Sequence, residues 1–478
     1  CEDRGIEFYG QLHALQKGAE VYPRLCQLFQ QADGRYNSGL FHFKAEKGQV
    51  EAPDGLTPGL AIDDKPLKDI LANLYYPESP YEFSVLPADI LGQVYEQFLG
   101  KVIRLTAGHQ AKVEDKPEVK KAGGVFYTPT YIVEYIVKHT LGKLLEGKHP
   151  GDPGVGQGAP LRVLDMACGS GSFLIVAYQM LLDWYLNEYV GEGAEKWAKG
   201  RAPRLAQTGT GDWRLTTAER KRILLEHIYG VDIDPQAVEV SKLSLLLKVL
   251  EGESEETVGK QLSMFHERAL PNLGQNIKCG NSLIGSDFYA GQQASFLDGE
   301  EQRRINAFDW EREFAGVFAS SGGFDVVVGN PPYIRIQALK EWAPRAVEFY
   351  KQRYHAASKG NYDIYVVFVE KGLSLLNPKG RLGFILPHKF FNAQYGAPLR
   401  VILATGKHLA KVVHFGDQQV FENATTYTCL MFLDKAGNEA FEFEKVGDLQ
   451  GWRENIPDAA DQASNVGTLP SAQATAAE

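Results

Sequence analysis

The sequence predicts an α/β protein, with a mostly parallel β-sheet covered by helices on both faces and a helical region in front of it. Two observations lead to this fold class. After residue 160, short runs rich in Val, Ile and Leu alternate with longer helical segments such as "SFLIVAYQMLLDWYLNEY", the pattern of βαβ units. Before residue 110, amphipathic stretches such as "ADILGQVYEQFLGKVI" indicate helices, and no strand pattern of useful length is found.

The strands expected in the α/β part are short apolar runs that end in turn residues. A helix beginning near Thr128 and Pro129, both good helix-start residues, precedes them. The last strand follows its predecessor with too little chain for a crossover helix, so we expect it to run antiparallel at one edge of the sheet. Residues 190–220 are expected to be a polar insertion. The expected strands cover 161–167, 228–233, 276–282, 324–331, 381–387, 411–416 and 426–434.

Composition shifts divide the chain into four predicted segments. Residues 1–110 form a helical domain, and 111–122, within "HQAKVEDKPEVKK", form a charged linker. The α/β domain spans 123–436, and 437–478 is a partly disordered linker toward a further domain, because its end is polar and rich in small residues. The chain opens on Cys1 in what reads as the middle of a helix, so we expect it to be a piece of a longer protein.

The cysteines and the hydropathy pattern exclude several classes of protein. The five cysteines are scattered without a CxxC pair, which argues against a zinc site or a disulfide framework, and no metal is expected. No apolar run of membrane-spanning length and no signal peptide is present. We therefore expect a cytoplasmic protein with no membrane partner.

The charge is distributed unevenly. The formal net charge of −10 alone would argue against a nucleic-acid partner. The segment from Lys371 to Lys411, however, carries Lys or Arg at 371, 379, 381, 389, 400, 407 and 411 and no Asp or Glu. We name it the basic segment. It predicts a surface for a phosphate backbone, with an ordinary solvated face as the alternative.

A glycine turn follows the first expected strand of the α/β part, in "VLDMACGSGSF". Gly169 and Gly171 allow a sharp turn and close approach of a ligand, although a plain structural turn would look the same. Leu174 stands where a dinucleotide fingerprint has its third glycine. Asp165, at the strand end, would repel a pyrophosphate and attract a cationic sulfonium or amino group.

The next two strands end in residues suited to a nucleoside. In "YGVDIDPQA", Asp232 can accept both hydroxyls of a ribose and Ile233 can lie on a purine face. Asp234, followed by Pro235, is better explained as a helix cap. In "CGNSL", Asn281 can donate to and accept from an adenine edge, or it can be an ordinary turn residue.

The stretch "FDVVVGNPPYIRIQ" ends a buried strand with an amide, two prolines and a tyrosine. Proline cannot donate to a sheet, so the strand must stop at Asn330, and the carboxyl end of a parallel strand is where α/β sheets bind ligands. Each residue before a proline is pushed to extended geometry, which makes Asn330 and Pro331 stiff.

The order of "GVFYTP", "DMACGSGSF", "GVDIDP", "GNSL", "NPPY", "RLGFILP" and "VFENATTYT" resembles the AdoMet-dependent N6-adenine DNA methyltransferases. More narrowly, it resembles those of the type IIG restriction–modification enzymes and related phage-defence methyltransferases. "CEDRGIE" and "ILGQVYEQFL" are similar to the helical region that precedes the methyltransferase there. The resemblance implies a Rossmann-like class I AdoMet methyltransferase sheet, with one antiparallel edge strand, acting on double-stranded DNA with a flipped adenine.

The resemblance also implies roles for single residues. The side-chain oxygen of Asn330 and the carbonyl of Pro331 accept the two N6–H bonds, and Phe421 is a second base-stacking residue beside Tyr333. Nuclease and target-recognition domains are expected elsewhere in the full-length chain. The implied catalytic residues are Asn330, Pro331, Pro332 and Tyr333. The implied S-adenosyl-L-methionine (AdoMet) site consists of Thr128, Pro129, Asp165, Ala167, Gly169, Gly171, Phe173, Asp232, Ile233, Asn281 and Ser282.

Other readings remain open at this stage. An NPPY motif is also found in methyltransferases of RNA guanine or protein glutamine, which need the same pair of acceptors for a planar amine. A non-catalytic DNA-binding subunit of a defence complex is a third possibility. The acceptor geometry would suit cytosine N4 as well, so the choice of adenine rests on the resemblance. Cys168, His388 and His414 are interpreted as structural residues.

Overall fold

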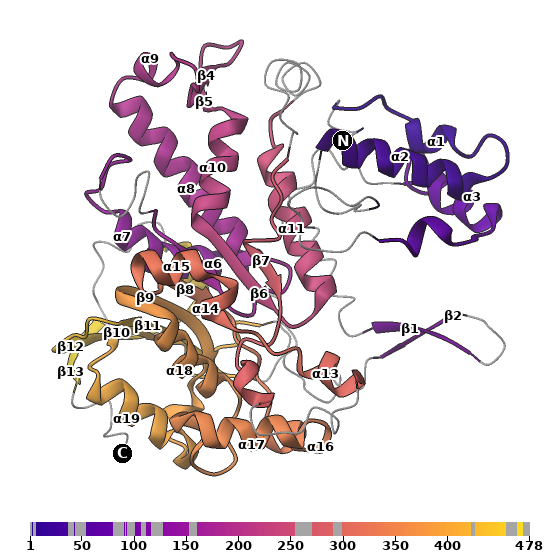
Figure 1. The fold of residues 1–478 in the computed structure, drawn as a ribbon. Coiled ribbons are helices and arrows are strands. Elements are labelled where there is room, and N and C mark those ends of the chain that lie inside the picture. Colours follow the sequence, from indigo (N-terminus) through magenta and orange to yellow (C-terminus); the bar gives the residue numbers. More distant parts are fainter. Residues whose placement is uncertain are drawn as a thin grey trace. The chain divides into compact units, whose positions relative to one another are not determined.

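The computed structural model (Figure 1) describes residues 2, 6–36, 43, 54–79, 90, 92, 101–106, 111–115, 128–152, 160–253, 270–289, 299–421, 426–455 and 466–471. The chain divides into two compact units. One contains Cys1–Leu91 and Lys242–Gly274, and the other contains Gly92–Ser241 and Gln275–Glu478. Among the described residues, no helix is long and apolar enough to cross a membrane.

The first unit is helical where the structure describes its N-terminal part, as predicted. Its elements are α1 (Gln11–Ala14), α2 (Val21–Tyr36), the 3-10 turn η1 (Thr57–Gly59) and α3 (Asp64–Ala72). Helices α2 and α3 contact each other, and Asp64 Oδ1 accepts the backbone N–H of Val21 at 2.8 Å. Much of the predicted helix over 88–103 lies outside the described residues.

A two-stranded hairpin stands where the sequence analysis expected a helix end and a linker. Strands β1 (Lys101–Leu105) and β2 (Ala111–Asp115) pair antiparallel, with Lys101 opposite Asp115. The predictions of helix at 101–103 and of linker at 111–115 are therefore wrong. Residues 111–114 alternate apolar and charged residues with a period of two, which favours a strand, although such charges are also typical of a linker. Residues 101–105 do not alternate, because Val102 and Ile103 are adjacent, and only their β-branched side chains favour a strand.

A nine-stranded sheet forms the centre of the second unit, in the order β13-β12-β10-β11-β9-β8-β3-β6-β7. Strands β7, β6, β3, β8 and β9 are all parallel, and β11 runs antiparallel between β9 and β10. Each strand predicted after residue 160 is present, and the mostly parallel sheet is confirmed. These strands are β3 (Val163–Asp165), β6 (Ile228–Asp232), β7 (Ile277–Cys279), β8 (Phe324–Gly329), β9 (Leu376–Pro387), β10 (Leu409–His414) and β11 (Thr428–Asp434).

The sheet continues past β11 into the segment that was predicted to be a linker. Strand β12 (Ala440–Lys445) pairs parallel with β10, and β13 (Val466–Pro470) pairs antiparallel with β12. The antiparallel part of the sheet is thus an edge region of several strands. The prediction of a linker is wrong for the residues of β12 and β13 and for α20 (Leu449–Glu454). In "AFEFEK", phenylalanines alternate with glutamates and Phe441 is buried, the pattern of a half-covered strand.

Helices cover the sheet. Helix α8 contacts β3 and β6, and α18 contacts β8 and β9. The helices, π-helix and 3-10 turns of this unit, including α11, which continues into the first unit, are α6 (Thr130–Val137), η2 (Lys138–Gly142), α7 (Lys143–Leu145), α8 (Ser172–Gly191), α9 (Ala194–Trp197), α10 (Thr217–His227), α11 (Pro235–Val249), η3 (Ser286–Tyr289), α13 (Gly299–Ile305), α14 (Trp310–Glu313), α15 (Ala315–Ser321), α16 (Ile336–Trp342), α17 (Pro344–Arg353), η5 (His355–Ala357), α18 (Tyr365–Leu375), η6 (His388–Phe391), η7 (Gln394–Gly396) and α19 (Ala397–Thr405). The polar insertion after α8 contains a hairpin of β4 (Leu205–Gln207) and β5 (Trp213–Leu215).

The central strand β8 shows why the sheet positions a site. Val326, Val327 and Val328 are fully buried, because β3 and β9 flank the strand and helices cover both of its faces. The strand ends at Gly329, directly before the Asn-Pro-Pro-Tyr motif. The motif is therefore held at the carboxyl end of the most buried part of the sheet.

Candidate active site

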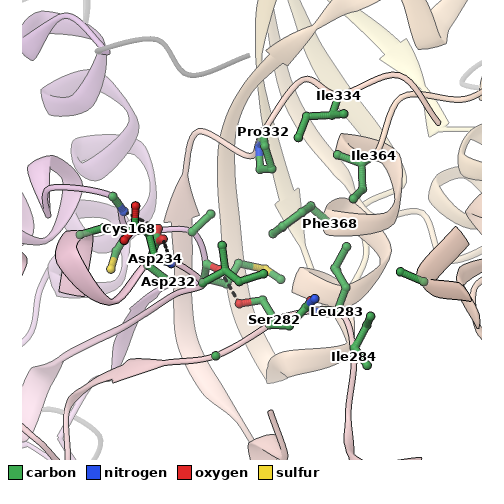
Figure 2. Close-up of a pocket in the computed structure, with 18 of the residues that line it drawn as sticks. Cys168, Asp232, Asp234, Ser282, Leu283, Ile284, Pro332, Ile334, Ile364 and Phe368 are labelled. Carbon is green, nitrogen blue, oxygen red and sulfur yellow. Dashed lines mark hydrogen bonds between the residues drawn. The ribbon is translucent and has the colours of Figure 1, made fainter. Parts of the chain in front are cut away.

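A cavity of about 360 Å³ opens at the carboxyl ends of β3, β6, β7 and β8. Figure 2 shows Cys168, Asp232 and Asp234 on one side, which we name the polar end. Pro332, Ile334, Ile364 and Phe368 lie on the other, which we name the apolar wall. The predicted site residues that line the cavity are Thr128, Asp165, Ala167, Gly169, Phe173, Asp232, Ile233, Asn281, Ser282, Asn330 and Pro332.

The glycine turn shapes the polar end. Gly169 and Gly171 have φ values of 53° and 88°, which side chains other than glycine rarely adopt. A Cβ on Gly171 would also stand 3.0 Å from the hydroxyl of Ser241 on α11. Helix α8 begins directly after Gly171, which does not itself line the cavity. The turn therefore needs glycine for both conformation and space.

Two carboxyl groups face the turn. Asp232 accepts the backbone N–H groups of Gly169 at 2.8 Å and of Asp234 at 2.9 Å, and Asp165 accepts that of Ala167 at 3.0 Å. Burial raises the pKa of Asp165 to about 8, and the nearby Asp232 carboxylate adds to the rise. Burial likewise raises the pKa of Asp232 to about 6. Both groups would ionise more readily beside a cationic ligand.

The residues after β7 combine a turn with a cavity surface. The side-chain oxygen of Asn281 accepts the backbone N–H of Leu283 at 3.0 Å. This contact is typical of a turn residue, which was one of the two predicted roles of Asn281. Ser282 donates to the carbonyl of Met166 and so joins the ends of β3 and β7. Ile233, which follows β6 on the same edge of the sheet, is 51% exposed beside the cavity. A bound ring would cover this apolar side chain.

Asn330 directly follows the end of β8 and lines the cavity. Its amide Nδ2 donates to the hydroxyl of Thr128 at 3.1 Å, and its Oδ1 atom is buried. Thr128 is 4% exposed and precedes Pro129, the N-cap of α6. The predicted helix start at Thr128 and Pro129 thus contacts the predicted catalytic amide, although Pro129 and Pro331 do not line the cavity.

The predicted base-stacking residues lie together just outside the lining of the cavity. The rings of Tyr333 and Phe421 meet edge to face with centroids 6.4 Å apart, and both side chains are buried. The Tyr333 hydroxyl donates to the carbonyl of Ile385 on β9 at 3.1 Å. The structure therefore brings these two rings together next to the Asn-Pro-Pro segment, and their role toward a base stays a prediction.

Comparison with known proteins supplies the family. Residues 226–421 match the family described as "Eco57I restriction-modification methylase", and residues 87–268 match the family described as "N-6 DNA Methylase". The two matches share the stretch 226–268 and together include every predicted site residue. The chain belongs to the DNA methylases of restriction–modification systems. The predicted α/β fold with a mostly parallel, Rossmann-like sheet is confirmed as well.

Two named relatives illustrate the similarity to other methylases. The type II restriction enzyme and methyltransferase RM.Eco57I of Escherichia coli is 35% identical over 95% of this chain, which spans 41% of that protein. The adenine-specific methyltransferase PglX of Streptomyces coelicolor is 25% identical over 59% of this chain, which matches 20% of its length. A cryo-electron microscopy structure of a DrdV–DNA complex is 16% identical with a TM-score of 0.49, covering 84% of this chain and 35% of that one.

The apolar wall of this methylase site includes residues that sequence reasoning missed. Ile364 and Phe368 come from α18 and the residue before it, and Trp342 and Tyr350 come from α16 and α17. Their helices have ordinary apolar periodicity, which predicts a core face and gives no sign of a cavity. On α13, Glu301 also lines the site and forms an ion pair with Arg345 of α17 at 2.9 Å.

Three of the seven cations of the basic segment form ion pairs with carboxylates of the same chain. Lys371 lies over the ring of Trp310, with its ammonium 6.0 Å from the centroid, and burial lowers the pKa of this lysine to about 8. That this segment marks the place of a phosphate backbone stays a prediction, and Lys379 and Lys389 are exposed. The ion pairs join Arg381 to Asp434 at 2.9 Å, Lys407 to Glu439 at 2.6 Å, and Lys411 to Glu442 and Glu444 at 3.6 and 3.2 Å.

The residues interpreted as structural behave differently from one another. Burial raises the pKa of the Cys168 thiol well above its ordinary value, so the thiol stays protonated and unreactive although it borders the cavity. The rings of His388 and His414 stack 4.3 Å apart, and burial lowers the pKa of both. Among the described residues, no group of His, Cys, Asp and Glu could hold a metal ion.

Proposed function

We propose that this chain transfers a methyl group from AdoMet to the N6 amine of adenine in double-stranded DNA. It would be the modification part of a restriction–modification or related phage-defence enzyme. The observation that carries the proposal is the placement of Asn330, whose amide stands at the carboxyl end of β8 on the border of a cavity with two carboxyl groups. The match to an N-6 DNA methylase family supports adenine over cytosine, whose exocyclic amine is N4.

The chemistry explains the choice of an amide. The lone pair of adenine N6 is delocalised into the ring, and its protons are too weakly acidic for removal by a base. Two fixed acceptors, the Asn330 side-chain oxygen and the Pro331 carbonyl, can take both N6–H bonds and draw the nitrogen toward a tetrahedral geometry. The two prolines hold these acceptors in place, so they need no reorganisation when charge develops.

The lining residues fit AdoMet. Asp165 and Asp232 at the polar end suit a cationic amino acid and ribose hydroxyls, and the exposed Ile233 and the apolar wall suit a purine ring. Asn281 and Ser282 would lie at the adenine edge, and Thr128, Ala167, Gly169 and Phe173 would surround the methionine part. Pro129 and Gly171, which do not line the cavity, would hold the backbone beside these residues. When bound, AdoMet supplies a methyl group activated by its sulfonium.

The target base must leave the duplex to reach Asn330. Tyr333 and Phe421 lie together beside the Asn-Pro-Pro segment, and base–aromatic stacking contributes roughly 1–3 kcal/mol per base. Both rings are buried in this structure, so we propose that they separate slightly to hold the flipped adenine. The chain spans 41% of RM.Eco57I, and we propose that site recognition and any DNA cleavage require segments of the full-length protein beyond this chain.

A ligand-stabilisation experiment tests the cofactor directly. The melting temperature is measured with saturating AdoMet and, separately, with NAD, the ligand of the other common glycine-turn fold. A ligand at 100 times its Kd stabilises by about 2.7 kcal/mol, which shifts the melting temperature by several degrees. A shift with AdoMet alone supports the proposal, and a shift with NAD alone overturns it.

A further inference from the structure

The hydrogen bond between Thr128 and Asn330 gives the start of α6 a role in the reaction. We infer that Thr128 is a positioning residue, whose hydroxyl accepts the amide N–H of Asn330 and keeps the amide oxygen available to the target amine. This inference rests on the proposed function and deepens it. In the sequence analysis, Thr128 was placed only among the AdoMet-binding residues.

The amide of Asn330 needs such a device. A carboxamide presents an acceptor at one end and a donor at the other, and the two ends have nearly the same shape. The prolines that follow fix the backbone of Asn330, but the terminal torsion of its side chain is soft and roughly two-fold. A flipped amide would point an NH₂ group at the N6–H donors of adenine, and the acceptor would be lost.

The geometry supplies the missing constraint. Thr128 Oγ1 lies 3.1 Å from Asn330 Nδ2, across 202 residues of sequence. Thr128 is 4% exposed, and the Asn330 oxygen is buried at the other end of the amide. The hydrogen bond from the nitrogen to threonine therefore fixes which end of the amide carries the acceptor oxygen.

The threonine itself is firmly held. It precedes Pro129, which restricts the backbone of Thr128 to extended geometry. The carbonyl of Pro129 accepts the N–H groups of Ile132 at 2.9 Å and Val133 at 3.2 Å, so the helix begins at a fixed point. Ile132 and Val133 are buried. A rigid helix start thus places one hydroxyl against the catalytic amide.

If Thr128 only bound the cofactor, its substitution would change AdoMet binding rather than the methyl-transfer step. Thr128 also lines the cavity, so a contact with AdoMet would show in the Kd of AdoMet. A positioning role acts on the methyl-transfer step, because the ground state with AdoMet alone does not use the Asn330 oxygen. The two roles therefore separate in binding and rate constants.

The test compares Thr128→Val with Thr128→Ser in the full-length protein. Valine keeps the shape and removes the hydroxyl, and serine keeps the hydroxyl. Single-turnover methylation of DNA, the Kd of AdoMet and the melting temperature are measured for each. We expect valine to slow transfer at saturating AdoMet by about 10- to 100-fold, beyond any change in the AdoMet Kd, and serine to recover most of this rate.

The outcomes distinguish this inference from the function on which it rests. Wild-type rates in Thr128→Val, or a loss that serine does not recover, would overturn the positioning role while methylation by the wild type still stands. A large rise in the AdoMet Kd with an unchanged rate at saturation would assign Thr128 to the cofactor alone. A wild-type protein that transfers no methyl group to any DNA would remove the proposed function itself.

Discussion

The backbone of Gly329 lies directly against the carboxyl group of Asp165. A Cβ built on Gly329 would stand 2.7 Å from Asp165 Oδ1, and the φ of Gly329 is 152°. Gly329 is the residue before Asn330, so the strand end that carries the amide touches the carboxyl group at the polar end of the cavity. The proposed catalytic and cofactor parts of the site thus share one close contact.

Replacing Gly329 by alanine should damage both parts at once. The added methyl group must displace either Asp165 or the Asn-Pro-Pro segment, and the backbone conformation disfavours it as well, at a cost of roughly 1–3 kcal/mol. We expect a lower melting temperature, an AdoMet Kd raised by at least about tenfold, and slower methylation. Gly316→Ala on α15, where a Cβ meets nothing within 4 Å, is the matched control and should have none of these effects.

The binding of AdoMet should release a proton near neutral pH. Because burial raises the pKa of Asp165 to about 8, this group is largely protonated at pH 7 in the ligand-free protein. A cationic ligand favours the carboxylate, so affinity should rise with pH up to about pH 8 and then level off. Calorimetry in buffers of different ionisation enthalpy counts the protons released.

The control for this prediction is Asp165→Asn, which cannot ionise. When AdoMet binds at pH 7, this variant should release almost one proton fewer than the wild type. Its affinity for AdoMet should also depend less on pH. Asp232, with its pKa raised to about 6, contributes mainly below pH 7. Equal proton release by wild type and Asp165→Asn would show that Asp165 is already ionised or does not face the ligand.

The amide of Asn330 should be required for transfer and dispensable for cofactor binding. Asn330→Ala removes an acceptor that is used only in the reaction, so we expect the single-turnover rate to fall by at least about 10²-fold with the AdoMet Kd unchanged within about twofold. Asn187→Ala, an exposed position on α8, serves as the control. Near-normal turnover in Asn330→Ala would remove the role assigned to the motif.

The exposed and the neutralised cations of the basic segment should differ in DNA binding. Both Lys407 and Lys389 are exposed, but Lys407 contacts both carboxylate oxygens of Glu439, at 2.6 and 2.7 Å, whereas Lys389 on η6 forms no ion pair with the residues that the structure describes. Lys389→Gln should reduce the slope of log Kd against log salt concentration by about one, and Lys407→Gln should leave it unchanged. The reverse ranking would contradict the structural assignment of these charges.

The fold was predictable where burial governs the sequence. The central strands are apolar on both faces and end in turn residues, so β3, β6, β8 and β9 stand out. Strands β2 and β12 alternate charged and apolar residues, and their charges concealed the period of two, whereas β1 has no such period. The ion pairs of the basic segment were not predictable, because partners such as Glu444 come from a later strand that lies beside the segment only in the folded sheet.

The polar part of the site was predictable for a similar reason. Asp165 and Asp232 are the last residues of their strands and Asn330 follows β8, and parallel strands bring such ends to one edge of the sheet. The apolar side of the cavity was not predictable, because Trp342 and Phe368 lie on helices whose apolar pattern fits an ordinary core. The hydrogen bond between Thr128 and Asn330 also depends on how α6 packs, which no local pattern specifies.

The most direct test of the account is the identity of the methylated nucleoside. DNA is incubated with the full-length protein and isotopically labelled AdoMet, then digested to nucleosides and analysed by mass spectrometry, with Asn330→Ala in parallel. The account predicts labelled N6-methyldeoxyadenosine with the wild type and none with the variant. Label in N4-methyldeoxycytidine, or equal label with Asn330→Ala, would contradict it.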